Sequence, residues 1–177
     1  AAISARVIDE NGNDVPHDNK TIGEIVLRGH WIMEQYYKEP EKTAAAWRDG
    51  WFHTGDAAKI DEDGYIIIAD RITDVIRSGS EMVPTVLLEN LTGNADFVLE
   101  ATYVGIPDEK WGEVGKAIIE LKPGGSLTLD ELQKFLGDRM AKYKIPKYMV
   151  IVDKLPRTVA AEKVQKFILK ERHGRAD

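Results

Sequence analysis

The sequence predicts an α+β protein in two parts, the first mainly β and the second built from alternating helices and strands. Short runs that alternate apolar and polar residues fill positions 1–69, and turn signals at 11–12 and 61–64 separate them. After Asp70 apolar residues recur at helical spacing, with β-branched runs between them. We therefore expect two units, 1–69 and 70–177, with the change of pattern at Asp70.

Each element of the first part has a local reason. Residues 3–7 alternate apolar with polar side chains and predict a strand, and the apolar run 25–27 predicts a second one. A proline at its first position favours a short helix over 40–47. Two strands flank the turn at 61–64, whose last residue is a glycine that tolerates the positive φ of a tight hairpin.

The second part opens with a strand-like pair at 75–76 and a turn at 78–80. Apolar residues at helical spacing then predict a helix over 83–91. Strands follow at 101–106 and 117–121, because β-branched and aromatic residues pack well on a pleated sheet.

A capping box marks the next helix. Thr128 and Glu131 have the spacing at which each side chain can bond the other's backbone N–H. The apolar stripe that continues to Met140 predicts an amphipathic helix, and 148–152 has the composition of a strand. A last helical pattern covers 164–168, and a glycine behind it would end that helix.

Composition and charge narrow the kind of protein. Hydrophobic residues make up 43% and charged residues 31% of the chain, as in soluble globular domains. The net charge of −6 argues against a general nucleic-acid surface. No uninterrupted apolar stretch approaches the roughly 20 residues that a membrane helix needs. Cysteine is absent, so the chain has neither disulfides nor a thiol nucleophile, and a reducing cytoplasm is the expected location.

Three segments carry reactive or charged side chains beside turns, at 50–56, 70–81 and 155–166. Asp56 can accept two hydrogen bonds from a ribose diol, or it can simply cap a turn. Arg71 can bind phosphate or ribose oxygens, or it can pair with a nearby aspartate at the surface. A lysine in the third segment can stabilise a developing negative charge, or it can belong to a solvated helix start. Taken singly, these residues leave both interpretations open.

The order and spacing of the motifs are more specific than any one of them. The chain contains, in this order, Gly-Glu-Ile-Val-Leu-Arg-Gly, Trp-Phe-His-Thr-Gly-Asp, Asp-Gly-Tyr, Asp-Arg, Gly-Ile-Pro-Asp, Trp-Gly-Glu and Pro-Arg-Thr, starting at residues 23, 51, 63, 70, 105, 111 and 156. With this arrangement the chain closely resembles AMP-forming acyl-CoA synthetases of the adenylate-forming enzyme superfamily over nearly its whole length. The run 70–79 looks most like the branch that acts on medium- and long-chain fatty acids.

The resemblance implies two half-reactions. A carboxylic acid attacks the α-phosphate of ATP to give an acyl-adenylate and pyrophosphate, and the thiol of CoA then displaces AMP to give a thioester. Such enzymes have a large N-terminal domain and a small C-terminal domain that rotates between the steps. By this resemblance 1–69 is the end of the large domain, including its β-barrel-like portion, and 70–177 is the small domain with its hinge at Asp70. Mg²⁺ would accompany ATP, with no metal site expected in this chain.

The resemblance also implies roles for single residues. Asp56 would hold the ribose hydroxyls of ATP and AMP, with Thr54 in the same nucleotide motif, and Arg71 would contact ribose or phosphate. Lys163 would bridge the α-phosphate and the substrate carboxylate during adenylation, supplying charge and positioning. The path of CoA would be lined by the turn Ser78, Gly79, Ser80 and Glu81.

Two positions depart from the family pattern. The family has Gly-Gly-Glu where this chain has Gly-Ser-Glu at 79–81, and the Cβ of Ser80 restricts positive φ. The family also has Thr-x-x-Gly-Lys, and the position of that lysine here holds Glu162, with no glycine before it. Lys163 fits if one residue is inserted after Thr158. A carboxylate beside the α-phosphate would repel the charge that the lysine should stabilise.

The sequence lacks the phosphate-binding loop, the acyl pocket and the adenine-binding segment of the family, so we expect a fragment of a longer chain that is inactive alone. One alternative is another adenylate-forming enzyme, such as an aryl-CoA ligase, a luciferase-like enzyme or a peptide-synthetase adenylation domain. A second alternative is a non-catalytic binding or regulatory derivative, which the departures at Ser80 and Glu162 would favour.

Overall fold

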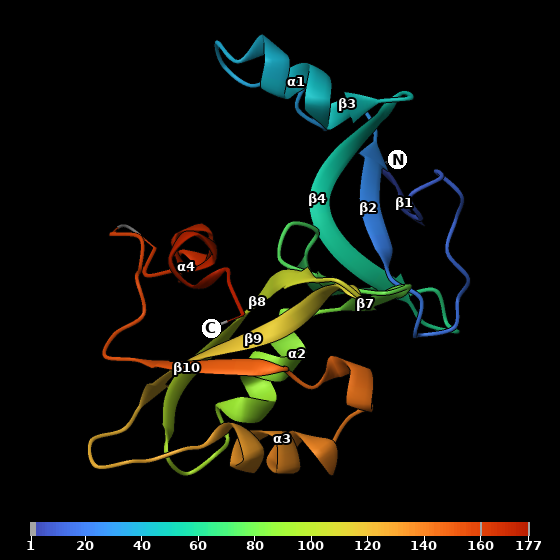
Figure 1. The fold of residues 1–177 in the computed structure, drawn as a ribbon. Helices are drawn as coiled ribbons and strands as arrows, with labels where there is room; N and C mark the ends of the chain where they lie inside the picture. Colours follow the sequence, from blue (N-terminus) through green and yellow to red (C-terminus); the bar gives the residue numbers. More distant parts are fainter. Residues whose placement is uncertain (1–2, 160, 177) are drawn as a thin grey trace. The chain divides into compact units, whose positions relative to one another are not determined.

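The computed structural model describes residues 3–159 and 161–176 and divides the chain into two compact units, 1–73 and 74–177 (Figure 1). Each unit has its own hydrophobic core. The division falls between Thr73 and Asp74, a few residues after the boundary that the sequence pattern predicts. Asp70 lies in the last strand of the first unit, and its role as a hinge stays a prediction.

The first unit is an antiparallel sheet with one short helix at its margin. Its strands lie in the order β1-β2-β4-β3, and β5 pairs with the second half of β4. The long strand β4 curves along its length, with β3 at its start and β5 at its end (Figure 1). The elements are β1 (Ser4–Ile8), β2 (Gly23–Arg28), α1 (Pro40–Ala46), β3 (Trp47–Arg48), β4 (Trp51–Ile60) and β5 (Ile66–Arg71).

The second unit is a mixed sheet covered by helices on both faces (Figure 1). Its order is β10-β9-β6-β7, with β8 forming a long antiparallel hairpin with β9 and β10 running parallel to β9. The elements are β6 (Ile76–Ser78), β7 (Glu81–Val83), α2 (Thr85–Thr92), β8 (Val98–Asp108), β9 (Gly112–Leu121), α3 (Leu129–Gly137), a 3₁₀ turn (Lys142–Lys144), β10 (Tyr148–Val152) and α4 (Lys166–His173).

Alternate residues of the central hairpin supply two cores. Ala101 and Tyr103 of β8 belong to the cluster that packs under α2 and α3, whereas Val104 and Ile106 belong to the cluster beneath α4. This is the period of two that successive strand residues impose. Because both faces are covered, most apolar side chains of the hairpin are buried, and the hydroxyl of the buried Tyr103 lies 2.5 Å from that of Thr92.

The predicted capping box is confirmed, since Glu131 N donates to Thr128 Oγ1 at 3.3 Å and Thr128 N donates to Glu131 Oε2 at 2.8 Å. The helix it begins ends at Gly137, so Met140 packs against the core from beyond the helix. The assignment of Val83 to a helix is wrong: it ends β7, and α2 begins after a proline. A residue before proline is biased towards extended backbone, which explains the difference.

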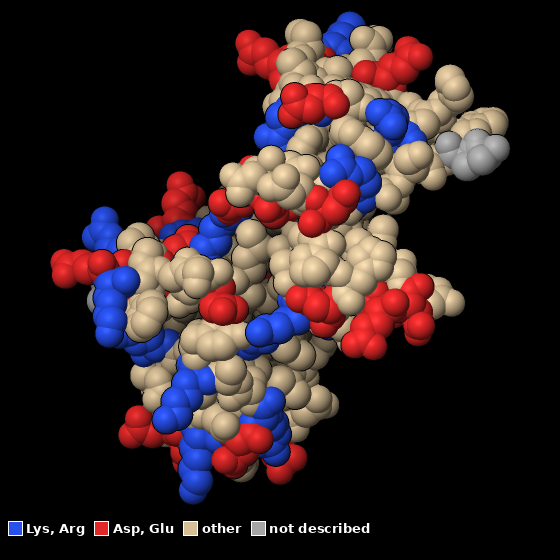
Figure 2. Space-filling model, turned by 90° about the vertical axis from the view of Figure 1, so that its right-hand side faces the viewer, with Lys and Arg blue, Asp and Glu red and all other residues tan. Residues whose placement is uncertain are grey.

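The final helix also starts later than the apolar pattern suggests, because Val164 forms an isolated bridge with Arg157 and α4 begins only at Lys166. No helix among the described residues is both long and apolar enough to cross a membrane. On the face that Figure 2 presents, Lys and Arg side chains are interspersed with Asp and Glu rather than gathered into one field of a single sign.

Candidate functional site

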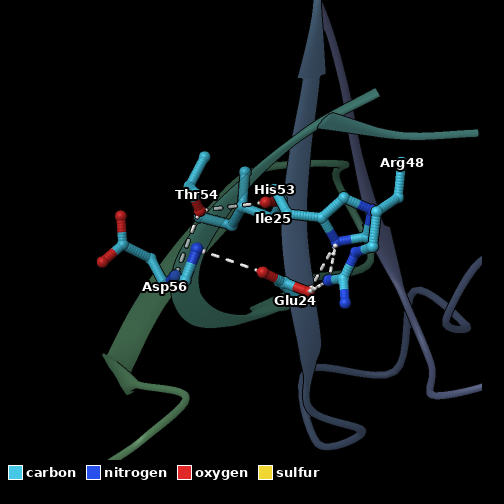
Figure 3. A network of polar contacts seen from close by, with 7 residues as sticks. Glu24, Ile25, Arg48, His53, Thr54 and Asp56 are labelled. Carbon is cyan, nitrogen blue, oxygen red and sulfur yellow. Dashed lines mark hydrogen bonds and ion pairs between the residues drawn. The ribbon is translucent and has the colours of Figure 1, made fainter. Parts of the chain in front are cut away.

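The Thr-Gly-Asp motif lies on β4 at an irregularity in the sheet. Gly55 has a φ of 73°, and the pairing of β4 with β2 shifts register between Glu24 and Val26. Thr54 Oγ1 donates to the carbonyl of Ile25 at 2.9 Å and accepts from Asp56 N at 3.1 Å (Figure 3). The hydroxyl of Thr54 is therefore engaged in holding the backbone that carries Asp56.

A carboxylate braces the same turn from β2. Glu24 Oε1 accepts from Gly55 N at 3.1 Å, and its Oε2 lies 2.8 Å from His53 Nδ1 (Figure 3). Arg48 Nη2 lies 2.7 Å from the same ring nitrogen and 3.5 Å from Glu24 Oε2. One nitrogen cannot donate and accept at once, so His53 either donates to Glu24 or accepts from Arg48. The Glu24 network thus fixes Gly55 whichever tautomer is present.

Asp56 and Arg71 face each other across β4 and β5. They are register partners, with Arg71 Nη1 2.6 Å from Asp56 Oδ1 and 3.3 Å from the carbonyl of Thr54. The Asp56 side chain is 31% exposed, and it points away from the Glu24 network in Figure 3. The pair combines a carboxylate that can accept from a diol with a guanidinium that can bind phosphate or ribose oxygens. The adjoining Asp70 is buried and accepts from Arg71 N at 2.8 Å.

The predicted CoA-path turn joins β6 and β7 through two residues, since Ser78 pairs with Glu81. Gly79 supplies the positive φ of this turn, at 63°. Ser80 is not among the described non-glycine residues with positive φ. Glycine first and an ordinary residue second is the pattern of a type II′ hairpin turn. The serine in place of a family glycine therefore fits the backbone without strain.

This turn forms part of the wall of a cavity of about 550 Å³ within the second unit. Gly79 N donates to the carbonyl of Trp111 at 2.7 Å, which ties the turn to the end of the β8–β9 hairpin. Aromatic rings and lysines complete the wall, a combination suited to a ligand with an apolar arm and anionic groups. The lining residues are Ser78, Ser80, Glu81, Trp111, Val114, Lys142, Tyr143, Ile145 and Lys147.

Asp108 organises the hairpin end that carries Trp111. Its Oδ1 accepts from the backbone N–H groups of Lys110 at 2.9 Å and Trp111 at 3.0 Å, and its Oδ2 lies 2.7 Å from Lys147 Nζ. The lysine and these N–H groups lower the pKa of Asp108, and the carboxylate raises the pKa of Lys147. Burial, followed by the charge of Glu81, raises the pKa of Tyr143, whose hydroxyl therefore stays neutral at physiological pH.

The two candidate lysines of the third segment differ sharply in their surroundings. Lys166 Nζ lies 2.8 Å from Glu89 Oε1 and also bonds the hydroxyl of Thr85, with its side chain only 14% exposed. The side chain of Lys163 is exposed and makes no hydrogen bond or ion pair with the residues that the structure describes. Lys163 is thus the lysine available to a ligand, although its catalytic role stays a prediction.

The residue before Lys163 has an unusual backbone. Glu162 has a φ of 50°, in the left-handed region that costs a residue with a side chain about 1–2 kcal/mol. With Lys163 aligned to the family lysine, Glu162 stands where the family has glycine, and the left-handed backbone is consistent with that shifted alignment. Of the segment expected to accommodate the extra residue, Ala160 lies outside the described residues.

Several residues of these sites escape prediction from the sequence. Glu24, Trp111 and Asp108 each lie in a motif that serves the family resemblance, but nothing local indicates what they contact. Tyr143 and Lys147 carry no such signal. Among residues 3–159 and 161–176, no group of three or more His, Asp or Glu is placed to hold a metal ion.

The chain is similar to known proteins in both sequence and fold. Residues 87–161 match the family described as the AMP-binding enzyme C-terminal domain. The 4-hydroxybutyrate–CoA ligase 2 of Metallosphaera sedula is 49% identical over 164 residues, or 93% of this chain and 30% of that protein. ATP-bound MatB from Rhodopseudomonas palustris superposes with a TM-score of 0.84 at 34% identity, over 98% of this chain and 34% of that one.

A second solved structure with a similar fold contains a bound acyl-adenylate. The o-succinylbenzoate-CoA synthetase MenE from Bacillus subtilis, in complex with the acyl-adenylate OSB-AMP, has a TM-score of 0.81 at 30% identity, over 95% of this chain and 34% of that one. The chain thus spans about a third of the length of the proteins it matches. The predicted α+β fold is confirmed. Residues 87–161 match the AMP-binding enzyme C-terminal domain, and the relatives that resemble the chain include CoA ligases.

Proposed function

We propose that this chain is the C-terminal part of an ATP-dependent, AMP-forming ligase that converts a carboxylic acid to its acyl-adenylate and then to its acyl-CoA thioester. The observation that carries the proposal is the Asp56–Arg71 pair on a braced glycine turn, in a chain 49% identical to a CoA ligase. The first unit would contribute nucleotide contacts and the second unit the lysine and the CoA path. Asp70 would act as the hinge between them.

In the adenylating step a carboxylate oxygen attacks the α-phosphorus of ATP and pyrophosphate leaves. Asp56 would accept from the ribose hydroxyls, and Arg71 would contact ribose or phosphate oxygens from the same strand pair. Lys163 would place its ammonium on the charge that develops between the carboxylate and the α-phosphate. Mg²⁺ would arrive with ATP.

In the second step the CoA sulfur attacks the acyl carbonyl carbon and AMP leaves with the bonding electrons. The turn at 78–81 would line the path of the pantetheine arm. Trp111 and Tyr143 offer apolar surface to that arm, while Lys142 and Lys147 offer positive charge to the anionic end of CoA. Thioester formation would thus depend on the turn and the cavity of the second unit, whereas adenylation would depend on its Lys163.

The class of acid remains a separate proposal. The resemblance of 70–79 to the fatty-acid branch favours a medium- or long-chain acid, whereas the relatives named above act on 4-hydroxybutyrate and o-succinylbenzoate. An aryl-CoA ligase or another adenylate-forming enzyme is the alternative, which a panel of acids would separate. The cytoplasmic location expected from the cysteine-free sequence is likewise a prediction.

A non-catalytic derivative is disfavoured by the two positions that suggested it. Ser80 occupies a turn position that needs no glycine, and Glu162 has a left-handed backbone that a glycine at this position would adopt without strain. Assay of the full-length protein with ATP, CoA and a panel of carboxylic acids tests the proposal. Thioester formation that depends on the acid and releases AMP supports it, and no thioester from any acid would favour the derivative.

A further inference from the structure

We propose that Arg157 is a positioning residue that holds the peptide unit before Lys163 in a conformation for which the family uses glycine. The inference rests on the proposed role of Lys163 as the adenylation lysine. Arg157 lies at the start of the loop that carries Lys163, and its guanidinium makes two contacts. Nη1 donates to the carbonyl of Glu162, and Nη2 donates to the carboxylate of Glu100 on β8.

Both polar groups of the Glu162–Lys163 peptide are held. Its carbonyl accepts from Arg157, and its N–H donates to Thr158 Oγ1 at 3.2 Å. A peptide unit is planar, so fixing both groups fixes its orientation and with it the direction in which the Lys163 side chain leaves the backbone. The two side chains that do this are consecutive, at positions 157 and 158.

Backbone hydrogen bonds close the rest of the loop. Thr158 N donates to the carbonyl of Lys163 at 2.9 Å, and Glu162 N donates to the carbonyl of Thr158 at 3.0 Å. Gln165 N donates to the carbonyl of Pro156 at 2.8 Å, beyond the bridge between Arg157 and Val164. The backbone therefore closes the loop independently of Arg157, and the arginine acts on one peptide unit within it.

That peptide unit is the one that needs support. Glu162 has a φ of 50°, which glycine adopts freely and glutamate does not. Arg157 stabilises this conformation by bonding the carbonyl that follows the strained φ, and Glu100 anchors the guanidinium to the central hairpin of the unit. Lysine lacks the planar fork that reaches two acceptors at once, so Arg157→Lys is not a conservative change here.

The test uses the full-length protein and measures the half-reactions separately. Adenylation is followed as pyrophosphate released from ATP and the acid without CoA, and thioester formation is followed from supplied acyl-adenylate and CoA. Arg157→Ala should slow adenylation by about 10- to 100-fold, as misplacement of a reacting group does, and leave thioester formation unchanged. Arg157→Lys should restore little. Arg139→Ala, which removes an exposed arginine just beyond the end of α3 in the same unit, should change neither rate.

The decisive variant is a second substitution at Glu162. If Arg157 compensates for the missing glycine, Arg157→Ala combined with Glu162→Gly should recover most of the lost adenylation rate. Arg157→Ala combined with Glu162→Ala should not, because alanine removes the carboxylate but keeps the Cβ. The proposal is overturned if Arg157→Ala lowers both half-reactions equally, or if the glycine and alanine double variants behave alike.

Amide hydrogen exchange separates this inference from the proposed function. Exchange of the Lys163 N–H should become faster in Arg157→Ala and return towards the wild-type rate in the glycine double variant, whether or not the protein forms acyl-adenylate. A wild-type protein that never forms acyl-adenylate would contradict the proposed function, and the exchange rate would then test only whether Arg157 holds the Glu162–Lys163 peptide unit. Unchanged exchange of the Lys163 N–H in Arg157→Ala would overturn that positioning role.

Discussion

Arg71 Nη1 lies 2.6 Å from Asp56 Oδ1, and strand pairing sets the two residues opposite each other on β4 and β5. The carboxylate stands on a turn whose glycine N–H is held by Glu24 and whose threonine hydroxyl is held by the carbonyl of Ile25. A carboxylate that can accept hydrogen bonds from a diol and a guanidinium that can donate them to an anion thus lie on one strand pair. Such preorganisation is what a nucleotide site requires of its polar groups.

The first prediction concerns Asp56. In the full-length enzyme Asp56→Ala should weaken nucleotide binding by about 3–6 kcal/mol, since two hydrogen bonds to a charged acceptor are worth about 1.5–3 kcal/mol each. Calorimetric titration with ATP measures this. Asp63→Ala, at the exposed turn between β4 and β5, is the matched control and should bind ATP as the wild type does. Unchanged affinity in Asp56→Ala would remove this residue from the site.

Substitution of Lys163 and substitution of Lys166 should have different effects, the first on the rate of adenylation and the second on the stability of the second unit. Lys163→Ala should slow acyl-adenylate formation by about 10²–10³, the usual effect of losing one preorganised charge contact, and spare both the melting temperature and thioester formation from supplied acyl-adenylate. Lys166→Ala should instead destabilise the second unit by about 1–3 kcal/mol, because the Glu89 carboxylate loses its ion-pair partner and keeps the hydrogen bond from Thr102 Oγ1. Thermal unfolding beside the two half-reaction rates distinguishes them. Normal adenylation by Lys163→Ala together with slow adenylation by Lys166→Ala would reverse the assignment.

The Trp111 side chain should contribute to the binding of CoA and not to the binding of ATP. It lines the cavity beside the turn at 78–81, and its carbonyl holds Gly79 N without help from the side chain. Trp111→Ala should therefore raise the KM for CoA and leave the KM for ATP and the adenylation rate unchanged. Phe97→Ala, which removes an exposed aromatic ring outside this cavity, serves as the control. An equal change in both KM values would mean that the substitution disturbs the fold rather than the CoA path.

Asp108 should make stability depend on pH at the acid end. Lys147 and backbone N–H groups lower its pKa in the folded state below the ordinary value of 3.8. A lowered folded pKa stabilises the protein above the ordinary pKa, and this contribution is lost as the pH falls through the folded value. The difference in melting temperature between wild type and Asp108→Asn should therefore shrink as the pH is lowered from 6 to about 3. A difference that is constant over this range would contradict the assignment.

The isolated chain should not make acyl-CoA. Its relatives are about three times as long, and the phosphate-binding loop and acyl pocket expected of the family are not among its 177 residues. Incubation of the purified chain with ATP, CoA and fatty acids, followed by chromatography for thioester, measures this. Turnover clearly above that of a protein-free blank would show that the chain holds a complete active site.

The elements that could be predicted from the sequence are those with local causes. Thr128 and Glu131 are three residues apart, and the capping box they predict is present as expected. For Val83 the sequence pattern predicts the wrong element, because apolar spacing over so few residues fits a helix and a strand equally. Only the proline that follows indicates that the helix starts later.

The contacts that build the sites are mostly distant in the chain. Glu24 lies 31 residues from the glycine it holds, and Asp108 lies 39 residues from Lys147. No periodicity or turn signal reports such pairings, because they depend on how strands align in the folded sheet. The family resemblance locates Asp56 and Arg71 but not their direct pairing, which follows from the register of β4 and β5.

The products of the full-length protein test the central claim most directly. Incubated with ATP, CoA and an accepted carboxylic acid, it should release AMP and pyrophosphate in amounts equal to the thioester formed, and release neither when the acid is omitted. ADP and orthophosphate in place of AMP and pyrophosphate, or thioester formed without AMP, would contradict the account.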